Sequence, residues 1–498
     1  MSSLPFAPLR PERNSATVPA LASRIRTARS ADPPRPTGRP DLVLVAASML
    51  GVLAALLVVG AGATFQSKVE RRLLGRWLEG GTFLWRTVGG GFQDRTGFVA
   101  ALLLLVLAWG VSGVRVLRQR GALGAPWTTA LLVAPALPFV LGPPFMSRDV
   151  YAYAAQGQLV LDGGNPYSQG IKALGRSTTV AAVDPMWRGT TSPYGPLALR
   201  LQEAAVWASG GHELLALALL RIVVVLCIAG SIVAVRRLAP VTLRTRATWL
   251  TCSPLLFVHV VAPVHLEAVV CLLLLTSLVL FTADRHMAAG ALAICAAEVK
   301  VTALVMVVCL AVIAGARFGR HAVRRLLTGG VAAAGVCVLL LPSDPFGWVR
   351  GLSTPGSGWA PFTPSSAMVS GLDELLDLLS IQASGWLIPL VRLGFALAGI
   401  IVFLTILRPS GQTVATTAGL AILAAAAAAP VLWPWYLVPA VLLLSTSRSW
   451  VLPAVIGGTG AFLALPLGTS VAERLGAVAV IAGAMTALLI RRQTLNAA

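Results

Sequence analysis

The chain alternates between long apolar runs and short connections rich in arginine. Each uninterrupted run is near the roughly 20 residues that a helix needs to cross the hydrocarbon core of a bilayer. The runs cover residues 41–63, 96–117, 125–142, 213–235, 264–282, 386–407 and 471–490. Less regular apolar stretches add spans at 247–262, 326–341, 413–429, 432–446 and 450–467, and extend the third run to 125–144.

The stretch 286–315 is too long for one span and carries Glu298 and Lys300 near its middle. We therefore expect two helices here, with Lys300 at their outer end and a return to the basic segment 317–325. The sequence thus predicts an all-α integral membrane protein with about 14 transmembrane helices.

Residues 1–40 contain eight prolines and seven arginines and cannot bury enough apolar surface to fold. We interpret them as a disordered cytoplasmic tail before one transmembrane domain, residues 41–492. The short basic connections fall on the same side as this tail, as the positive-inside rule requires. The protein is then a multi-pass plasma-membrane protein with both termini in the cytoplasm. The two long connections, 145–212 and 342–385, face the outside.

Two shorter segments are predicted to lie along the outer membrane surface. Segment 67–79 has the pattern of an interfacial amphipathic helix, with Trp77 and Trp85 as interfacial aromatic residues. Segment 194–209 is apolar but interrupted by polar residues, so we interpret it as a juxtamembrane or re-entrant helix.

The composition agrees with a membrane protein, because 56% of the residues are hydrophobic and only 12% are charged. The net charge of +20 is explained by arginines in the short connections, so nucleic acid is not an expected partner. All six cysteines lie in apolar runs, which excludes a disulfide framework in an external loop. The histidines show no metal-ligand spacing, and we expect neither a metal nor another cofactor.

An acid stands where the third apolar run ends. Ser147 can cap a helix that starts at Arg148, and on this helix Asp149, Tyr153 and Gln156 share one face. Asp149 is a candidate catalytic base at the outer surface. An alternative interpretation is that it only stabilises the helix N-terminus through the helix dipole.

Base-assisted sugar transfer from a lipid phosphate also requires cations for the departing phosphate, and aromatic and polar groups for the sugars. The candidate phosphate ligands at the outer ends of the helices are Arg148, His265, Lys300 and Arg350. The candidate sugar ligands are Tyr151, Tyr153, Gln156, Tyr167, Tyr194, Glu267 and Trp435. Ion pairing inside the bundle and interfacial aromatic belts are the competing explanations for these residues.

A series of motifs resembles one known family. It begins with Ser-Arg-Asp-Val-Tyr-Ala-Tyr-Ala-Ala-Gln-Gly at 147–157 and continues with Leu-Asp-Gly-Gly-Asn-Pro-Tyr at 161–167. Ser-Pro-Tyr-Gly-Pro at 192–196, His-Leu-Glu at 265–267 and Val-Lys-Val-Thr at 299–302 follow. In order and spacing they resemble the actinobacterial polyprenol-phosphomannose-dependent α-1,6-mannosyltransferases, over roughly residues 41–490.

The resemblance implies a GT-C glycosyltransferase with an external active site. Its donor would be a polyprenyl (decaprenyl) phosphomannose and its acceptor a lipid-anchored mannan of lipomannan and lipoarabinomannan. Asp149 matches the family's acid in the first large external loop. The implied reaction inverts the β-linked donor to an α product in one displacement, for which one carboxylate base is sufficient.

Two departures from the family pattern concern the acceptor. The family's His-Asn-Glu or His-Asn-Asp is His265-Leu266-Glu267 here, and its Asp-Pro-Tyr is Asn165-Pro166-Tyr167. Two other functions stay open: a related transferase for another lipid-linked sugar such as arabinofuranose, and a polytopic transporter or flippase. Transporters tend to contain internal repeats, and we find none in this sequence.

Overall fold

A computed structural model gives the fold of most of the chain. The structure describes residues 41–63, 66–75, 77, 95–118, 126–340, 344–352, 360, 362–381, 385–408 and 411–465. The predicted tail 1–40, the predicted last span 471–490 and Trp85 lie outside the described residues.

Every described element of secondary structure is helical, which confirms the predicted all-α class. Five helices are long and apolar enough to cross a membrane. They are α2 (Leu42–Gly62), α5 (Arg95–Arg118), α12 (Glu213–Leu238), α17 (Leu304–Leu340) and α21 (Leu387–Leu407). The chain is therefore a polytopic membrane protein.

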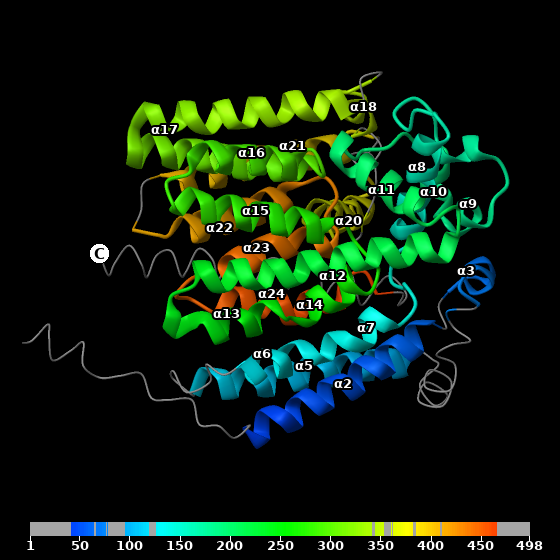
Figure 1. Ribbon diagram of the computed structural model, residues 1–498, viewed down its shortest axis with the longest axis horizontal. Helices are drawn as coiled ribbons and strands as arrows, with labels where there is room; N and C mark the ends of the chain where they lie inside the picture. Colours follow the sequence, from blue (N-terminus) through cyan, green and yellow to red (C-terminus); the bar gives the residue numbers. More distant parts are fainter. Residues whose placement is uncertain are drawn as a thin grey trace, which may run out of the picture.

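Shorter helices, most of them apolar, pack between these five (Figure 1). They are α6 (Pro126–Val133), η2 (Ala134–Ala136), α7 (Leu137–Leu141), α13 (Arg244–Thr251), α14 (Pro254–Leu256), η5 (Phe257–Val261), α15 (Glu267–Thr282), α16 (His286–Ala297), η6 (Val301–Ala303), α22 (Val414–Ala428), η7 (Pro434–Leu437), α23 (Val438–Leu444), α24 (Val451–Thr459) and η8 (Gly460–Phe462). In addition, η4 (Val241–Leu243) joins α12 to α13, and α20 (Pro364–Leu378) packs against α21 and α22.

The prediction of a single helix at 247–262 is wrong, because this segment contains Pro254 and divides into α13, α14 and η5. The segments 126–141 and 434–444 are continuous apolar helices, although short 3-10 turns stand at their prolines. Proline lacks an amide hydrogen and its ring clashes with the preceding turn, so a helix cannot continue undisturbed through it. The last part of segment 247–262 is the π-helix η5, which leads toward the candidate site.

The predicted division of the chain beyond Lys300 is confirmed. Helix α16 ends at Ala297, and α17 is interrupted at Gly319, where φ is 77°. Phe318, just before this break, packs on Phe281 and His286. The end of α17 lies far from there, because the Leu340 carbonyl accepts hydrogen bonds from Arg200 of α11. The two halves of α17 therefore run in opposite directions, with the break in the basic segment.

The short helices of segment 145–212 gather at one end of the bundle (Figure 1). This end carries α3 (Lys68–Leu73), α8 (Asp149–Leu161), η3 (Ile171–Leu174), α9 (Thr178–Ala182), α10 (Pro185–Arg188), α11 (Pro196–Ala208) and α18 (Trp348–Gly351). The basic connections after α12 and within α17 lie at the opposite end (Figure 1). We call the first end the cap end.

Helices α8 and α11 form the centre of the cap end, and α11 is the helix predicted at 194–209. They approach so closely that a Cβ atom on Gly157 would stand 2.5 Å from the Gln202 carbonyl oxygen. Tyr151 and Tyr153, on α8, are fully buried. Close packing against α11 therefore fixes α8 along its length, and with it the residues that α8 presents.

Candidate active site

Asp149 begins α8 after a strained segment. Met146 has a φ of 73°, in the left-handed region that residues with side chains seldom adopt. The Ser147 hydroxyl accepts a hydrogen bond from the Asp149 amide at 3.2 Å. The helix starts at Asp149 with Arg148 as its N-cap, one residue later than predicted. The Asp149 side chain is 19% exposed.

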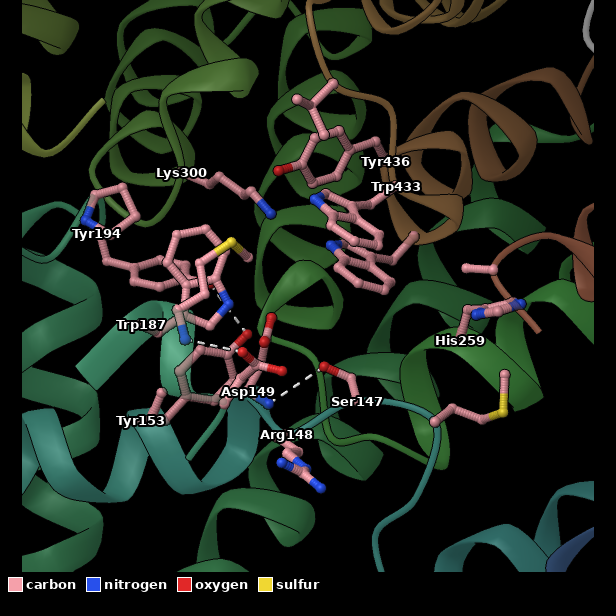
Figure 2. A pocket seen from close by; sticks show the side chains of 18 of the residues that line it. Ser147, Arg148, Asp149, Tyr153, Trp187, Tyr194, His259, Lys300, Trp433 and Tyr436 are labelled. Atoms are coloured by element: carbon pink, nitrogen blue, oxygen red, sulfur yellow. Dashed lines mark hydrogen bonds between the residues drawn. The ribbon is translucent and has the colours of Figure 1, made fainter. Parts of the chain in front are cut away.

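A cavity of about 590 Å³ opens beside Asp149. Its lining combines acids, cations and aromatic rings from elements that are far apart in the sequence. These residues include Glu70, Arg148, Asp149, Tyr153, Gln156, Asp184, Trp187, Tyr194, His259, Lys300, Trp433, Trp435 and Tyr436. In the view of Figure 2, Lys300 and Tyr436 reach into the cavity from above, and Asp149 and Tyr153 lie below them. Asp149, Tyr153 and Gln156 thus share the cavity-facing side of α8 as predicted.

His265 lies behind Asp149 and is fully buried. Its Nδ1 is 3.5 Å from Asp149 Oδ2, 3.3 Å from the Tyr153 hydroxyl and 3.8 Å from Glu267 Oε2. The Tyr153 hydroxyl is also 3.3 Å from that of Tyr194. Because Nδ1 faces two carboxylates, a proton on this nitrogen suits the surroundings best. His265 was predicted as a phosphate ligand, but it is not part of the cavity lining.

The backbone that carries His265 is irregular. The π-helix η5 ends at Val261, and α15 begins only at Glu267. Between them Val264 has a φ of 64°, an unusual value for a β-branched residue. Strained residues of this kind persist only where the surroundings hold them, and they concentrate at functional sites. Met146 and Val264 stand directly before the two segments that meet at Asp149.

Lys300 lies between α16 and η6 and lines the cavity. Its ammonium group pairs with Glu267 and lies 4.2 Å from the centre of the Tyr436 ring. The pairing is with Glu267 rather than with the neighbouring Glu298. A close backbone contact fixes the connection, since a Cβ on Gly195 would be 2.2 Å from the Glu298 carbonyl oxygen. This contact joins the 192–196 and 299–302 motifs.

Three aromatic rings form a column beside the cavity. Trp433 and Trp435 are stacked with their ring centres 5.1 Å apart and an angle of 1° between them. Trp435 also stacks on His265, with centres 3.9 Å apart. The tryptophans line the cavity, whereas the histidine at the end of the column contacts Asp149. Of this column, the sequence predicted only Trp435 and His265 as ligands.

Burial raises the pKa of Asp149 to about 6. The Lys300 ammonium opposes this increase because it favours the carboxylate, and Glu267 adds to it. A carboxyl group with this pKa is ionised at neutral pH and is a stronger proton acceptor than an exposed aspartate. Asp149 is therefore suited chemically to act as a general base.

The short helix α3 docks onto the site from the predicted interfacial segment. Ser67 and Glu70 form a capping box at its N-terminus. Glu70 also pairs with Arg148, with 3.1 Å between Nη2 and Oε2. Arg148 is therefore held at the edge of the cavity by a carboxylate from another element.

Arg221 is a buried residue that sequence analysis missed. It lies in the N-terminal half of α12. Its side chain donates to the carbonyls of Phe139 and Gly142 before Asp149, and of Ala262 before His265. The Trp77 ring covers the guanidinium at 5.0 Å. The interrupted helices leave carbonyl groups without helical partners, and Arg221 supplies the donors. The signal was a single arginine within an otherwise apolar span, which is costly and seldom accidental.

The remaining predicted ligands lie outside the cavity lining. Tyr151 is fully buried. The Tyr167 hydroxyl donates to the Tyr194 carbonyl at 2.8 Å. Arg350 is 63% exposed and pairs with Asp344. Tyr167 thus supports the position of Tyr194, while Arg350 stands apart from the residues that meet at Asp149.

Comparison with known proteins identifies relatives of the chain. A family model described as "Alpha-(1->6)-mannopyranosyltransferase, N-terminal domain" matches residues 48–316. The Alpha-(1->6)-mannopyranosyltransferase A of Corynebacterium glutamicum is 26% identical over 73% of this chain and 81% of its own. Alpha-(1->6)-mannopyranosyltransferase B of the same organism is 24% identical over 76% and 72%. The Mycobacterium tuberculosis Alpha-(1->6)-mannopyranosyltransferase A is 32% identical over 40% and 39%. No solved structure matches the chain.

The matched region covers more than half of the chain and includes Asp149, Arg221, His265 and Lys300. The resemblance expected from the motifs is thereby confirmed. This polytopic membrane protein belongs to the Alpha-(1->6)-mannopyranosyltransferase family.

Proposed function

We propose that the chain is an inverting GT-C glycosyltransferase that moves mannose from polyprenyl phosphomannose to a lipid-anchored mannan acceptor. The product is an α-1,6 linkage in lipomannan and lipoarabinomannan, made at the outer face of the plasma membrane. Family membership supports the reaction type. The position of the cavity, at the bundle end opposite the basic connections, supports the outer location.

The observation that carries this proposal is the setting of Asp149. Its carboxylate borders the cavity, contacts a buried histidine and has a raised pKa. In the reaction the acceptor's C6 hydroxyl oxygen attacks the anomeric carbon of mannose, and the bond from that carbon to the phosphate oxygen breaks. The hydroxyl proton passes to Asp149, and the polyprenyl phosphate leaves with the bonding electrons. One displacement inverts the β-linked donor to an α product.

The leaving phosphate gains negative charge, which a nearby cation stabilises. Lys300 and Arg148 line the cavity and are held in place by Glu267 and Glu70. Lys300 is the better-placed candidate, since it is nearly buried and its charge is screened little by water. Arg350 lies outside the cavity lining and is left without this role.

The sugars require flat apolar surfaces and hydrogen-bonding groups at the same time. Trp433 and Trp435 provide stacked rings, and Trp187 stands beside Asp149 and Tyr153 in Figure 2. Gln156 lines the cavity and accepts a hydrogen bond from Ser192 at 3.2 Å, so its amide nitrogen stays available as a donor. We assign these residues to mannose recognition.

Exchanging the carboxylate for an amide tests the assignment. Asp149→Asn keeps the shape of the side chain but cannot accept the proton, so mannosyl transfer should fall by about 10²- to 10⁴-fold. The measurement is the transfer of radiolabelled mannose from polyprenyl phosphomannose in membranes. The elution profile of the detergent-solubilised protein verifies that each variant is expressed and folded. Asp162→Asn, at the exposed far end of the same helix, is the matched control and should retain activity.

A wild-type transfer rate in Asp149→Asn would refute the role of this residue as base. Offering polyprenyl phosphoarabinofuranose in parallel, with the same mannan acceptor, tests the sugar. Arabinose transfer without mannose transfer would identify the alternative donor. Binding of both donors without any product would instead support a transporter.

A further inference from the structure

A second, apolar pocket of about 120 Å³ adjoins the active-site cavity. The two share four residues at their boundary: Thr302, Ala429, Lys300 and Tyr436. Beyond these the second pocket is walled by α15, α17, α22, α23 and the short η6. The residues that line it there are Glu267, Val270, Leu274, Ala303, Val305, Ile422, Ala425, Ala426 and Pro439. We call it the prenyl pocket, after the hydrocarbon ligand proposed for it.

Its size sets it apart from an ordinary packing defect. Protein interiors are packed as densely as organic crystals, with few voids larger than a water molecule. An apolar cavity of about 150 Å³ is known to stay dry and to bind benzene. The prenyl pocket is of this order and is lined mainly by hydrocarbon side chains, so its natural occupant is a short hydrocarbon group.

The pocket opens toward the outside of the bundle. At its rim Thr302 is exposed, and Val305 and Ala425 are half-buried. The adjoining outer face of α17 is apolar, since Leu304 is 40% exposed and Val308 is 46% exposed. Exposed leucine and valine on a membrane-spanning helix face lipid. A hydrocarbon chain that leaves the pocket therefore continues into the bilayer without crossing water.

Polar, charged and apolar surroundings follow one another from the active-site cavity to the prenyl pocket. The active-site cavity holds the hydrogen-bonding and aromatic groups, Lys300 stands at the boundary, and the apolar pocket lies beyond it. Figure 2 shows Lys300 and Tyr436 together on the same side of the cavity. The surroundings therefore suit a sugar, a phosphate and a hydrocarbon in the order in which these groups are joined in a prenyl phosphosugar.

We propose that the prenyl pocket binds the first isoprenyl unit of the donor lipid, with the phosphate at Lys300 and the rest of the chain in the bilayer. The inference rests on the proposed function, because it assumes a prenyl phosphomannose donor. It assigns to α15, α17, α22 and α23 a substrate-binding role that the acid and the sugar-binding residues do not share.

Filling the pocket from α22 tests this proposal. Ala425 is half-buried and lines the pocket, whereas Ala424 is half-buried on the same helix but is not part of the lining. Ala425→Phe should raise the KM for decaprenyl phosphomannose and for the two-unit donor citronellyl phosphomannose by about tenfold or more, because it displaces buried hydrocarbon. The KM for the mannan acceptor should not change. Ala424→Phe is the matched control and should leave every constant near the wild-type value.

A second measurement is independent of turnover. A citronellyl phosphomannose analogue with a diazirine on its first isoprenyl unit should label the pocket walls on α15, α17, α22 or α23 in the wild-type protein and not in Ala425→Phe. Labelling outside the pocket, or an unchanged donor KM in Ala425→Phe, would overturn the assignment of the prenyl pocket. If the wild-type enzyme is active in that case, the proposed function still stands. Specific labelling at the pocket without mannose transfer by the wild type overturns the proposed function and leaves the pocket assignment intact.

Discussion

The proposed chemistry of this protein depends on how one carboxyl group is surrounded. Asp149 is nearly buried, which raises its pKa, and it faces a cation, which limits the increase. It also contacts His265, whose ring is stacked on Trp435. A carboxylate in this setting is held in one orientation and stays ionised at neutral pH. The balance between burial and Lys300 is therefore what makes the group a usable base.

The pH dependence of the rate should follow from this balance. The pKa of Asp149 is raised to about 6, so protonation below that pH removes the base. The value of kcat/KM for mannosyl transfer should therefore rise through about pH 6 and level off above it. Initial rates measured in detergent micelles or vesicles across this range test the expectation.

Replacing Lys300 tests the direction in which its charge moves the pKa of Asp149. Lys300→Met removes a positive charge that favours the carboxylate, so the rising part of the profile should move to higher pH. Lys300→Arg keeps the charge and should move it less. A shift to lower pH in Lys300→Met would contradict the assignment of the rising part of the pH profile to Asp149.

His265 should act on the rate through Asp149. His265→Leu removes the ring nitrogen that faces the carboxylate, and kcat should fall by about 10- to 100-fold, part of the contribution of general base catalysis. The donor KM should change little, because His265 is outside the cavity lining. His265→Asn retains a donor group and should recover part of the activity.

The control for this change is His286→Leu. His286 is also buried, but it packs against Phe281 and Phe318 near the break in α17. Loss of kcat in both variants would indicate a general effect on folding. An increase in the donor KM alone in His265→Leu would restore the original prediction of a phosphate ligand.

At the scale of the elements, interruptions in helices create the site. Prolines and strained residues end α7 and η5 early, and the released carbonyl groups are bound by Arg221 of α12. Asp149 and His265 follow these ends within eight residues. The contact of α8 with α11 then fixes the first of the two segments. Irregular backbone is tolerated at membrane depth only where protein groups satisfy it, and here that requirement places the two functional segments side by side.

Close packing of α8 on α11 can be tested with one methyl group. Gly157→Ala places a Cβ against backbone that has no side chain to move, so we expect a loss of about 1–3 kcal/mol in stability. The measurements are thermal unfolding in detergent and kcat. Gly110→Ala on α5 is the control, since no atom lies within 4 Å of its added Cβ. Equal stability of the two variants would contradict the α8–α11 packing.

The whole molecule is polarised along the direction of its helices. The cavity and the short helices occupy the cap end, and the basic connections occupy the other end (Figure 1). Arginine-rich connections stay in the cytoplasm, so the polarity predicts that the cavity faces outward. In the proposed reaction, a site at this level receives its lipid-borne donor from the bilayer and its acceptor from the water phase.

Labelling of intact cells tests the orientation. Met186 is 49% exposed at the cavity, and Val241 is 74% exposed in the basic connection after α12. A membrane-impermeant maleimide should modify Met186→Cys in intact cells and Val241→Cys only after permeabilisation. The wild-type chain measures the background from its own cysteines. The reverse pattern would show that the cavity faces the cytoplasm.

The sequence by itself determined the helical class, the membrane setting and the shared face of Asp149, Tyr153 and Gln156. These follow from local periodicity and hydropathy, which each segment carries on its own. The partners of Asp149 depended on the tertiary structure. The sequence predicted His265 as a phosphate ligand, whereas the structure places it as a buried neighbour of the acid. Glu267, predicted as a sugar ligand, pairs with Lys300. Contacts between distant segments depend on where helices are interrupted and which groups remain to be satisfied. Arg221 and the prenyl pocket emerge only when α12, α15, α17 and α22 are packed together.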